Sequence, residues 1–197
     1  KYNRAVVALL GAGAMILFGV YPNQAAAIHG IDWNTIGLLT GMMVIVAVTQ
    51  RTGVFQFLAI WSAKKVNARP WGILVMLSIV TAVLSALLDN VTTVLLIAPV
   101  TLLITEELEI APYPFLFAEI LFSNIGGTAT LIGDPPNILI GSQVETITFN
   151  SFLTEVAPIV PLIFIMTLLP IYVMWGRKLT ASDEAMARVM NFKAKEA

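Results

Sequence analysis

Long apolar stretches alternate with short polar ones along most of the chain, and each apolar stretch is about as long as a bilayer is thick. A helix needs about 20 residues to cross the hydrocarbon core of a membrane. The pattern therefore predicts full spans near residues 5–21, 33–50 and 156–175, an interrupted apolar segment at 71–105, and a second interrupted segment at 115–142. The expected fold is an all-α integral membrane domain.

Two regions outside these spans differ in character. Residues 53–68 mix aromatic and aliphatic side chains with Lys64 and Lys65, which predicts an amphipathic helix lying at the membrane interface. Residues 179–197 are soluble in character, as expected for a cytoplasmic tail or a linker. We therefore expect one membrane domain at 1–178, followed by this tail.

The distribution of basic residues predicts the orientation. The loops expected at 22–32 and 143–155 contain neither lysine nor arginine, so all eleven basic residues fall in segments on the other side. Cytoplasmic loops are enriched in lysine and arginine. We therefore expect a cytoplasmic N-terminus, with the chain in a bacterial or archaeal plasma membrane.

Residues 71–105 must then leave and return to the same side of the membrane. A re-entrant hairpin and two full spans both satisfy this requirement. We favour a hairpin bent at LLDNVTT, because no outside loop of any length is present there. Two full spans would need a tight turn among the lipid headgroups and would make Asp89 a surface residue.

Composition indicates that lipid is the main solvent of the chain. Hydrophobic residues make up 58% of it and charged residues 12%, with a mean hydropathy of +0.87. In an ordinary soluble domain about a quarter of the residues are charged. A net charge of −1 provides no electrostatic argument for a nucleic-acid partner. Without cysteine, disulfide and thiolate chemistry are excluded.

Two acidic residues inside the apolar segments are the first candidates for chemistry. Asp89 and Asp134 are flanked by apolar residues, where an ionised side chain costs about 3 kcal/mol or more. Oxygen-bearing side chains lie near both acids in sequence, whereas lysine and arginine do not. Carboxylates and neutral oxygens without a basic partner suit a small hard cation or a proton. Alternatively, the threonines and asparagines only bridge helices or bond to backbone carbonyls.

The stretch SNIGGTATLIGDPPNILIGS, residues 123–142, interrupts its apolar segment with glycines and prolines. We expect Gly126-Gly127 to unwind a helix and the run GDPP to keep it unwound, because proline lacks an amide hydrogen and restricts the preceding residue. Asn137 can restart the helix. Unpaired backbone survives at membrane depth only where protein buries it or where it lines a cavity. Broken helices bind ions in secondary transporters, so the break is the predicted binding site.

Together the two motifs resemble a known family. LLDNVTTVLLIAPV and SNIGGTATLIGDPPNILIGS are similar to the two signature segments of the ArsB/NhaD-type permeases of the ion transporter superfamily, with the nearest resemblance to the P-protein branch. The resemblance implies two inverted repeats, each with a re-entrant hairpin and a broken helix, which work by alternating access and often as a dimer. Only one hairpin and one break are present, so the chain resembles the N-terminal repeat and would need a second repeat or a second copy.

The resemblance also implies which residues bind the transported ion or substrate. They are Asp89, Asn90, Thr92, Thr93, Ser123, Asn124, Gly126, Gly127, Thr128, Gly133, Asp134 and Asn137. In the related anion symporters the two segments hold a sodium ion, and the corresponding positions here are Asn90, Thr93, Gly126 and Asp134. The two added carboxylates make proton coupling or cation exchange more attractive than dicarboxylate transport.

The function expected is secondary active transport of an inorganic or small organic ion, coupled to H⁺ or Na⁺, with no enzymatic activity and no bound cofactor. Two alternatives stay open. An intramembrane aspartyl protease would also use two membrane aspartates, but this chain has LDN and LIGDPP where that class has YD and GxGD motifs. The second alternative is a passive channel or a structural membrane subunit.

Overall fold

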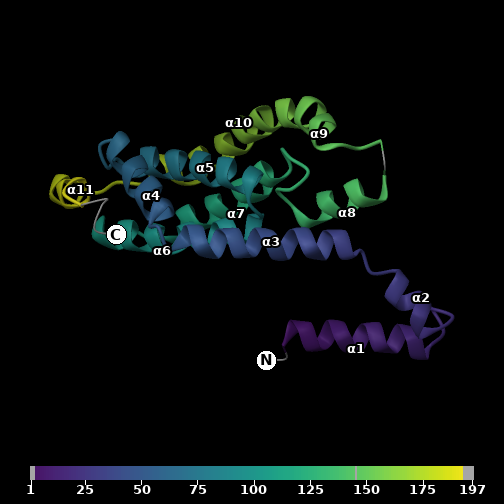
Figure 1. Ribbon diagram of the computed structural model, residues 1–197. Coiled ribbons are helices and arrows are strands. Elements are labelled where there is room, and N and C mark those ends of the chain that lie inside the picture. Colours follow the sequence, from purple (N-terminus) through teal and green to yellow (C-terminus); the bar gives the residue numbers. More distant parts are fainter. Residues whose placement is uncertain (1–2, 145, 193–197) are drawn as a thin grey trace.

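The computed structural model describes residues 3–144 and 146–192, and these ranges fold into helices without a β-strand (Figure 1). The helices are α1 (Arg4–Leu17), α2 (Gln24–His29), α3 (Trp33–Gln50), α4 (Val54–Lys65), α5 (Pro70–Leu87), α6 (Asn90–Glu107), α7 (Tyr113–Gly127), α8 (Pro135–Gln143), α9 (Phe149–Glu155), α10 (Val160–Ile171) and α11 (Asp183–Met190). A 3₁₀ turn, η1 (Ala157–Ile159), and a π-helical turn, η2 (Tyr172–Gly176), flank α10. Residues 1–2 of the predicted domain and 193–197 of the predicted tail lie outside this description. The predicted all-helical fold is confirmed.

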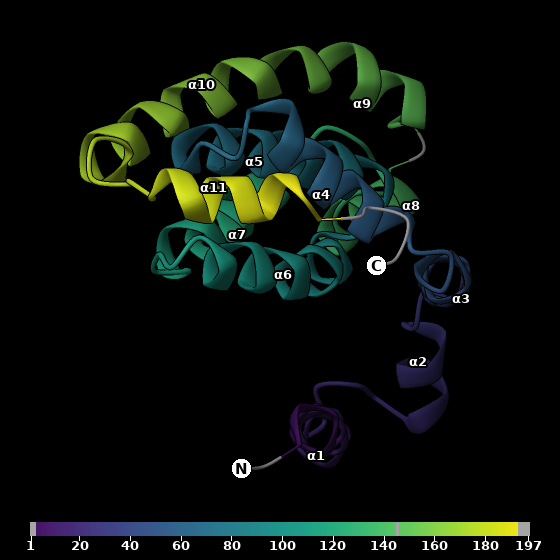
Figure 2. The ribbon, with the colours of Figure 1, turned by 90° about the vertical axis from the view of Figure 1, so that its left-hand side faces the viewer.

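Three helices form the centre of the bundle. α5 packs extensively along α7, and α6 lies against α7. Large apolar side chains from these helices are completely buried, among them Ile73, Leu77, Ile97, Phe115 and Phe122. Seen from the end in Figure 2, α9 and α10 arc over α5, while α6 lies on the opposite side. α3 contacts α6 and α8, and both views show α1 and α2 standing apart from the bundle.

Four helical segments are long and apolar enough to cross a membrane, namely α3, α5, α6 and the stretch from Phe149 to Gly176. The last of these begins earlier than hydropathy predicted, because α9 has a capping box. Thr148 Oγ1 accepts the backbone N–H of Ser151 at 3.2 Å, and Ser151 Oγ accepts that of Thr148 at 2.7 Å. Reciprocal bonds of this kind stabilise a helix start, so the predicted polar loop contains a helix.

The segments that carry most of the basic residues gather at one end of the bundle, on the left in Figure 1. We call this end the base; it comprises the end of α3, α4, the starts of α5 and α7, the end of α6, and the segment from η2 to α11. Trp71 packs edge-to-face on Tyr172 at a centroid distance of 5.0 Å, and Trp175 packs on Tyr113 at 5.9 Å and on Phe117 at 5.4 Å. Aromatic residues are typical of the membrane–water boundary, which agrees with the position of the base at the ends of the spans.

Helix α11 belongs to the predicted tail, yet it packs onto the base. Ala185 and Val189 lie one turn apart and are completely buried, where α11 contacts α4 and α6. Arg188 Nε donates to Glu107 Oε1 at 2.7 Å, and Arg188 Nη2 donates to Glu109 Oε1 at 2.6 Å. Apolar residues at this spacing give a short helix a face to bury, so this part of the tail is docked structure.

At the opposite end of the bundle, Asp32 caps α3. Its Oδ1 accepts the backbone N–H groups of Asn34 at 3.0 Å and Thr35 at 3.2 Å, and its Oδ2 accepts the Thr35 hydroxyl at 2.6 Å. Hydrogen bonds, chiefly from the Ser142 side chain and then from Thr35, hold the pKa of Asp32 at about 2. Ser142 lies in α8, the helix after the break, which packs against α3.

Candidate functional site

The chain between α5 and α6 turns within two residues. α5 ends at Leu87, Leu88 is extended with φ −116° and ψ −174°, and Asp89 is the N-cap of α6. One carboxylate oxygen of Asp89 accepts the backbone N–H of Thr92 at 2.8 Å. Asp89 is 8% exposed. An acid at an N-cap satisfies amide groups of the first helical turn, so Asp89 stabilises the tip that joins the two helices.

The break in the second motif is present, but it begins later than predicted. α7 continues through Gly127 and α8 starts at Pro135, so the prediction that Gly126-Gly127 unwind the helix is wrong. A Cβ atom on Gly126 would lie 2.1 Å from the carbonyl oxygen of Ala82. Glycine at this position therefore permits the close approach of α5 and α7, and the non-helical segment is 128–134.

Side chains from both ends of the break hold the non-helical segment in place. Thr130 Oγ1 donates to the carbonyl oxygen of Ala86 at the end of α5 and accepts the N–H of Gly133 at 3.1 Å. Asn137 Nδ2 donates to the carbonyl oxygens of Thr130 at 3.1 Å and Gly127 at 3.4 Å. Backbone groups that a continuous helix would pair internally are paired here by side chains, as a break within an apolar bundle requires.

The two motifs meet at Asn90, the first residue of α6. Asn90 Nδ2 donates to Asn124 Oδ1 at 3.0 Å and to Asp134 Oδ1 at 3.5 Å. Asn124 lies before the break in α7 and Asp134 lies after it. We call Asn90, Asn124 and Asp134 the polar junction. It brings the hairpin tip and both sides of the break into one place.

A cavity of about 270 Å³ adjoins the junction, and we call it the polar cavity. It is lined by Asn90, Val91, Val94, Leu95, Ile120, Ser123 and Asn124. Between Arg69 and Arg177 the sequence contains no lysine, arginine or histidine. The charged groups that this half of the bundle contributes at membrane depth are therefore carboxylates, which attract cations or protons.

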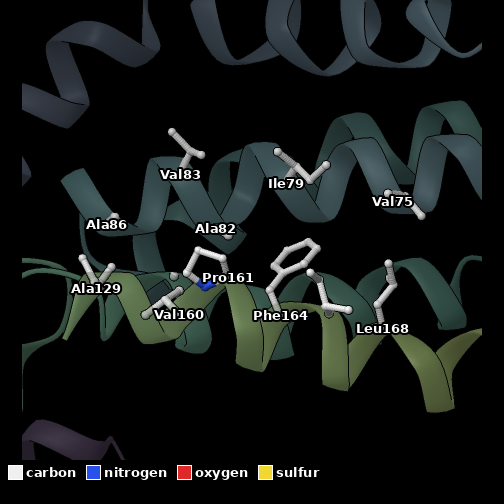
Figure 3. A pocket seen from close by; sticks show the side chains of 13 residues that line it. Val75, Ile79, Ala82, Val83, Ala86, Ala129, Val160, Pro161, Phe164 and Leu168 are labelled. Atoms are coloured by element: carbon white, nitrogen blue, oxygen red, sulfur yellow. The ribbon is translucent and has the colours of Figure 1, made fainter. Parts of the chain in front are cut away.

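A second cavity, of about 520 Å³, lies between α5 and α10 beside the break (Figure 3). Figure 3 shows Ile79 and Val83 of α5 on one side of it and Pro161 and Phe164 of α10 on the other. All of its lining side chains are apolar, so we call it the apolar cavity. Gly126 and Ala129 also line it. Helix α7 therefore borders both cavities, since its residues Ser123 and Asn124 line the polar cavity.

The hydroxyl groups predicted to surround the acids have different environments. The Thr93 side chain is completely buried, and its Oγ1 has no hydrogen-bond partner among the described residues. Ser123 Oγ donates to the carbonyl oxygen of Ile120 at 3.0 Å, and Thr128 Oγ1 donates to that of Ile125 at 2.7 Å. Ser123 and Thr128 thus bond within their own helix, which is the arrangement that the alternative interpretation of these residues expected.

One residue of the site was missed in the sequence. Ser85 is completely buried, and its Oγ donates to the carbonyl oxygen of Ser123 at 2.6 Å. A Cβ atom on Gly133 would lie 2.7 Å from the carbonyl oxygen of Ser85, so the non-helical segment folds back onto the end of α5. The available signal was the spacing of Thr81, Ser85 and Asp89 at every fourth residue. This spacing places Thr81 and Ser85 on one face of α5, and Asp89 follows just beyond the end of that helix.

The four positions carried over for sodium do not share one surface. Asn90 and Asp134 are bonded to each other, whereas Gly126 packs on Ala82 and Thr93 is buried. Within the described ranges, no group of three or more His, Cys, Asp or Glu residues is arranged to hold a metal ion. Sodium binding at these positions stays a prediction.

Comparison with known proteins places the chain among transporters. The family model described as citrate transporter, CitMHS, matches residues 1–194. An uncharacterized transporter of Mycobacterium tuberculosis is 48% identical over 204 residues, which cover 100% of this chain and 46% of that protein. A 46 kDa membrane protein of Mycobacterium leprae is 44% identical over 200 residues, with 100% and 46% covered. The human P protein is 43% identical over 147 residues, with 73% and 18% covered.

The chain spans about half the length of the mycobacterial proteins that it matches. The match to the P protein confirms the predicted resemblance to that branch of the ion transporter superfamily. The family and the relatives that are named for an activity are transporters rather than enzymes, which argues against the aspartyl protease alternative. The chain belongs to the citrate transporter family, CitMHS.

Proposed function

We propose that this chain is one half of a secondary active transporter that moves an inorganic or small organic ion by alternating access, coupled to H⁺ or Na⁺. The supporting observation is the pair of bonds from Asn90 Nδ2 to Asn124 Oδ1 at 3.0 Å and to Asp134 Oδ1 at 3.5 Å. A helix tip that meets a helix break exposes backbone and side-chain oxygens within an apolar bundle. Secondary transporters bind their ions in such an arrangement.

The coupling ion would bind at the polar junction. Asp134 is the N-cap of α8 but makes no side-chain capping bond, so its carboxylate remains available to an ion. Asp89 precedes Asn90 directly and adds a second negative charge nearby. Because residues 70–176 contain no basic side chain, a bound cation or proton is what this half offers to balance the two acids.

In the membrane, α5 and α6 would form a re-entrant hairpin that enters from the cytoplasmic base and returns to it. Both helices have their outer ends at the base, and their tip lies beside the break in the middle of the bundle (Figure 1). In the same orientation the N-terminus and α4 would lie on the cytoplasmic side of a bacterial or archaeal plasma membrane. α4 buries Phe55 and Ile60 and ends in Lys64 and Lys65, as expected for a helix at the interface.

The polar cavity would be completed by a second repeat or by a second copy of the chain. The relatives are about twice as long as this chain, and Asn124 and Thr128 are exposed on the surface that faces away from the bundle core. A covering half would shield these polar groups from lipid and supply the rest of the substrate contacts. Two such units would form the homodimer that the superfamily resemblance implies.

For the substrate, the description of the family names citrate, and an inorganic ion is the second candidate. Asp89 and Asp134 would repel a carboxylate at short range. An anionic substrate would therefore bind with the coupling cation between it and these acids, or through basic groups of the other half. Either arrangement makes transport of an anion depend on the coupling ion.

The proposal is tested by flux into proteoliposomes with the complete gene product that carries this chain. Citrate, other small carboxylates and inorganic ions would be offered under imposed H⁺ or Na⁺ gradients. We expect uphill uptake of one substrate under one gradient, and its loss in Asp89→Asn and Asp134→Asn. Uptake that only follows the substrate's own gradient would indicate a passive channel, and undiminished uptake in both variants would refute the site.

A further inference from the structure

A line of buried polar side chains runs from the hairpin tip toward the base, between α5, α6 and α7. We call these residues the buried polar seam: Ser78, Thr81, Ser85, Thr93, Thr101, Thr105, Glu119 and Ser123. Each of them is at most 1% exposed. Buried polar groups in proteins are normally hydrogen-bonded, yet Ser78 Oγ, Thr81 Oγ1, Thr93 Oγ1 and Glu119 Oε2 have no partner among the described residues.

Glu119 is the ionisable member of the seam. It lies on α7, one helical turn before Ser123, and it is 1% exposed. Thr101 Oγ1 of α6 donates a hydrogen bond to Glu119 Oε1, while Glu119 Oε2 is buried and has no hydrogen-bond partner within residues 3–144 and 146–192. A carboxyl group that only joined two helices would not leave one of its oxygens buried and unpaired, because that costs free energy.

No cationic group compensates this carboxyl. α7 packs against α5, α6 and α10, and α5 and α10 contain no titratable residue. On α6 the titratable residues are Glu106, which is exposed, and Glu107, which is bonded to Arg188. An unpaired ionised carboxylate at such a position is expensive, so the group must hold either a proton or a metal ion. One carboxyl and one hydroxyl provide too few ligands for a hard cation, which takes six or more oxygens.

We propose that Glu119 is a second proton-binding site of the transporter, separate from the polar junction, and that it takes up and releases one proton in each transport cycle. The inference rests on the proposed transport function. The remainder of the seam connects the two sites. Ser123 lies one turn, about 6 Å, further along α7, and it accepts the Ser85 hydroxyl at its carbonyl oxygen at 2.6 Å. The unpaired hydroxyls of Thr81 and Thr93 provide further groups that can pass a proton through ordered water.

The test measures proton stoichiometry in proteoliposomes that contain the complete gene product. The reversal potential of substrate flux under imposed pH gradients gives the number of protons moved per substrate. Glu119→Gln keeps the size of the side chain and its contact with Thr101 but cannot ionise. We expect Glu119→Gln to reduce the stoichiometry by one proton, while Glu106→Gln, an exposed control on the neighbouring helix, leaves it unchanged. An unchanged stoichiometry in Glu119→Gln would overturn the proposal.

A second measurement does not depend on transport. Infrared difference spectra of the purified protein between acidic and alkaline pH should show a carboxylic acid C=O band that Glu119→Gln removes and Glu106→Gln retains. If Glu119→Gln does not fold, Thr101→Val replaces it, since loss of the hydroxyl donor should shift the pH at which the band appears. A wild-type spectrum without a band assignable to Glu119, or a band unmoved in Thr101→Val, would refute the second site.

The two proposals fail in distinguishable ways. If no substrate is transported uphill by the wild type, the proposed function fails, while the infrared titration still decides whether Glu119 exchanges a proton. If transport proceeds and is lost in Asp134→Asn, but Glu119→Gln has the wild-type stoichiometry, the proposed function stands and the second site is refuted.

Discussion

The C-terminal half of α7 borders two cavities of opposite character, and the comparison between them shows why we propose the ion site on one side of this helix. The polar cavity, of about 270 Å³, contains Asn90, Ser123 and Asn124. The apolar cavity, of about 520 Å³, is larger but has only apolar side chains around it, including Gly126 and Ala129. The proposed ion site is therefore not at the larger cavity; it lies where polar groups converge on one side of α7.

The difference follows from how helix periodicity divides α7. Ser123 and Asn124 turn toward α6, whereas Gly126 turns toward α5, against which it packs at Ala82. The apolar side can be filled by hydrocarbon at little cost, whereas the polar side would leave amide and carboxylate groups unpaired in lipid. If this division is correct, substitutions on the two sides should separate effects on stability from effects on ion binding.

The largest effect is expected where α5 and α7 are in closest contact. Gly126→Ala would place a methyl group 2.1 Å from the Ala82 carbonyl oxygen, and we expect a loss of stability of about 3 kcal/mol. Gly37→Ala is the matched control, because a Cβ atom there would meet nothing within 4 Å. Thermal unfolding and monodispersity of both variants in detergent would show the contrast. Equal behaviour would contradict the close approach of α5 and α7.

A smaller loss of stability is expected at the side chain that anchors the break. Thr130→Val would leave the Ala86 carbonyl and the Gly133 amide without their partner, at a cost of about 1–3 kcal/mol. Thr128→Val is the control. It removes a bond from an exposed hydroxyl to the carbonyl oxygen of Ile125, three residues earlier, so we expect little change in stability. Hydrogen exchange of residues 128–134 should rise in the first variant alone. Equal exchange in the two variants would assign the anchoring to other groups.

On the polar side, Asn90→Ala should weaken ion binding more than folding. It removes the bonds to Asn124 Oδ1 and Asp134 Oδ1. We expect the binding free energy of the coupling ion to fall by about 1 kcal/mol, which corresponds to a roughly fivefold weaker apparent affinity. Asn34→Ala, at the start of α3, serves as the control, because the bond of Asn34 to Asp32 is made by its backbone N–H and is kept in the variant. Ion titration of the complete gene product by a thermal-shift assay would measure the affinity in both variants. An unaltered affinity in Asn90→Ala would contradict ion binding on the polar side of α7.

The smallest effect is expected on the apolar side. Val83→Thr introduces a hydroxyl beside the apolar cavity at a residue that is 57% exposed. The hydroxyl can bond to a carbonyl of its own helix, so we expect a change in stability below about 0.5 kcal/mol and the same ion affinity as the wild type. A clear change of ion affinity in Val83→Thr would show that the apolar cavity takes part in the solute pathway.

Several features could be predicted because they depend on local sequence. The break near GDPP is one of them, although its end was predicted too late. Asn137 was expected to restart the helix, whereas α8 starts at Pro135, because proline fits the first turn of a helix, where its missing N–H costs nothing. That the two motifs share one site was implied by the family resemblance, and the bonds of Asn90 bring the motifs together. Gly126 shows the limit of this reasoning. From the sequence alone, a glycine pair is as consistent with an unwound helix as with close helix packing. The contact of Gly126 with Ala82 shows that it serves close packing here.

The sequence by itself determined the membrane setting of this protein, the positions of its main helices, and the lack of basic side chains from residue 70 to 176. These are properties of composition and of short-range geometry. Only the tertiary structure decided that Asn90 reaches Asn124, that Ser85 bonds to Ser123, and that Glu119 is buried with a free oxygen. Periodicity indicates which face of a helix is polar. Which residues that face contacts depends on the packing of helices whose bonded residues lie 18 to 38 positions apart in the chain.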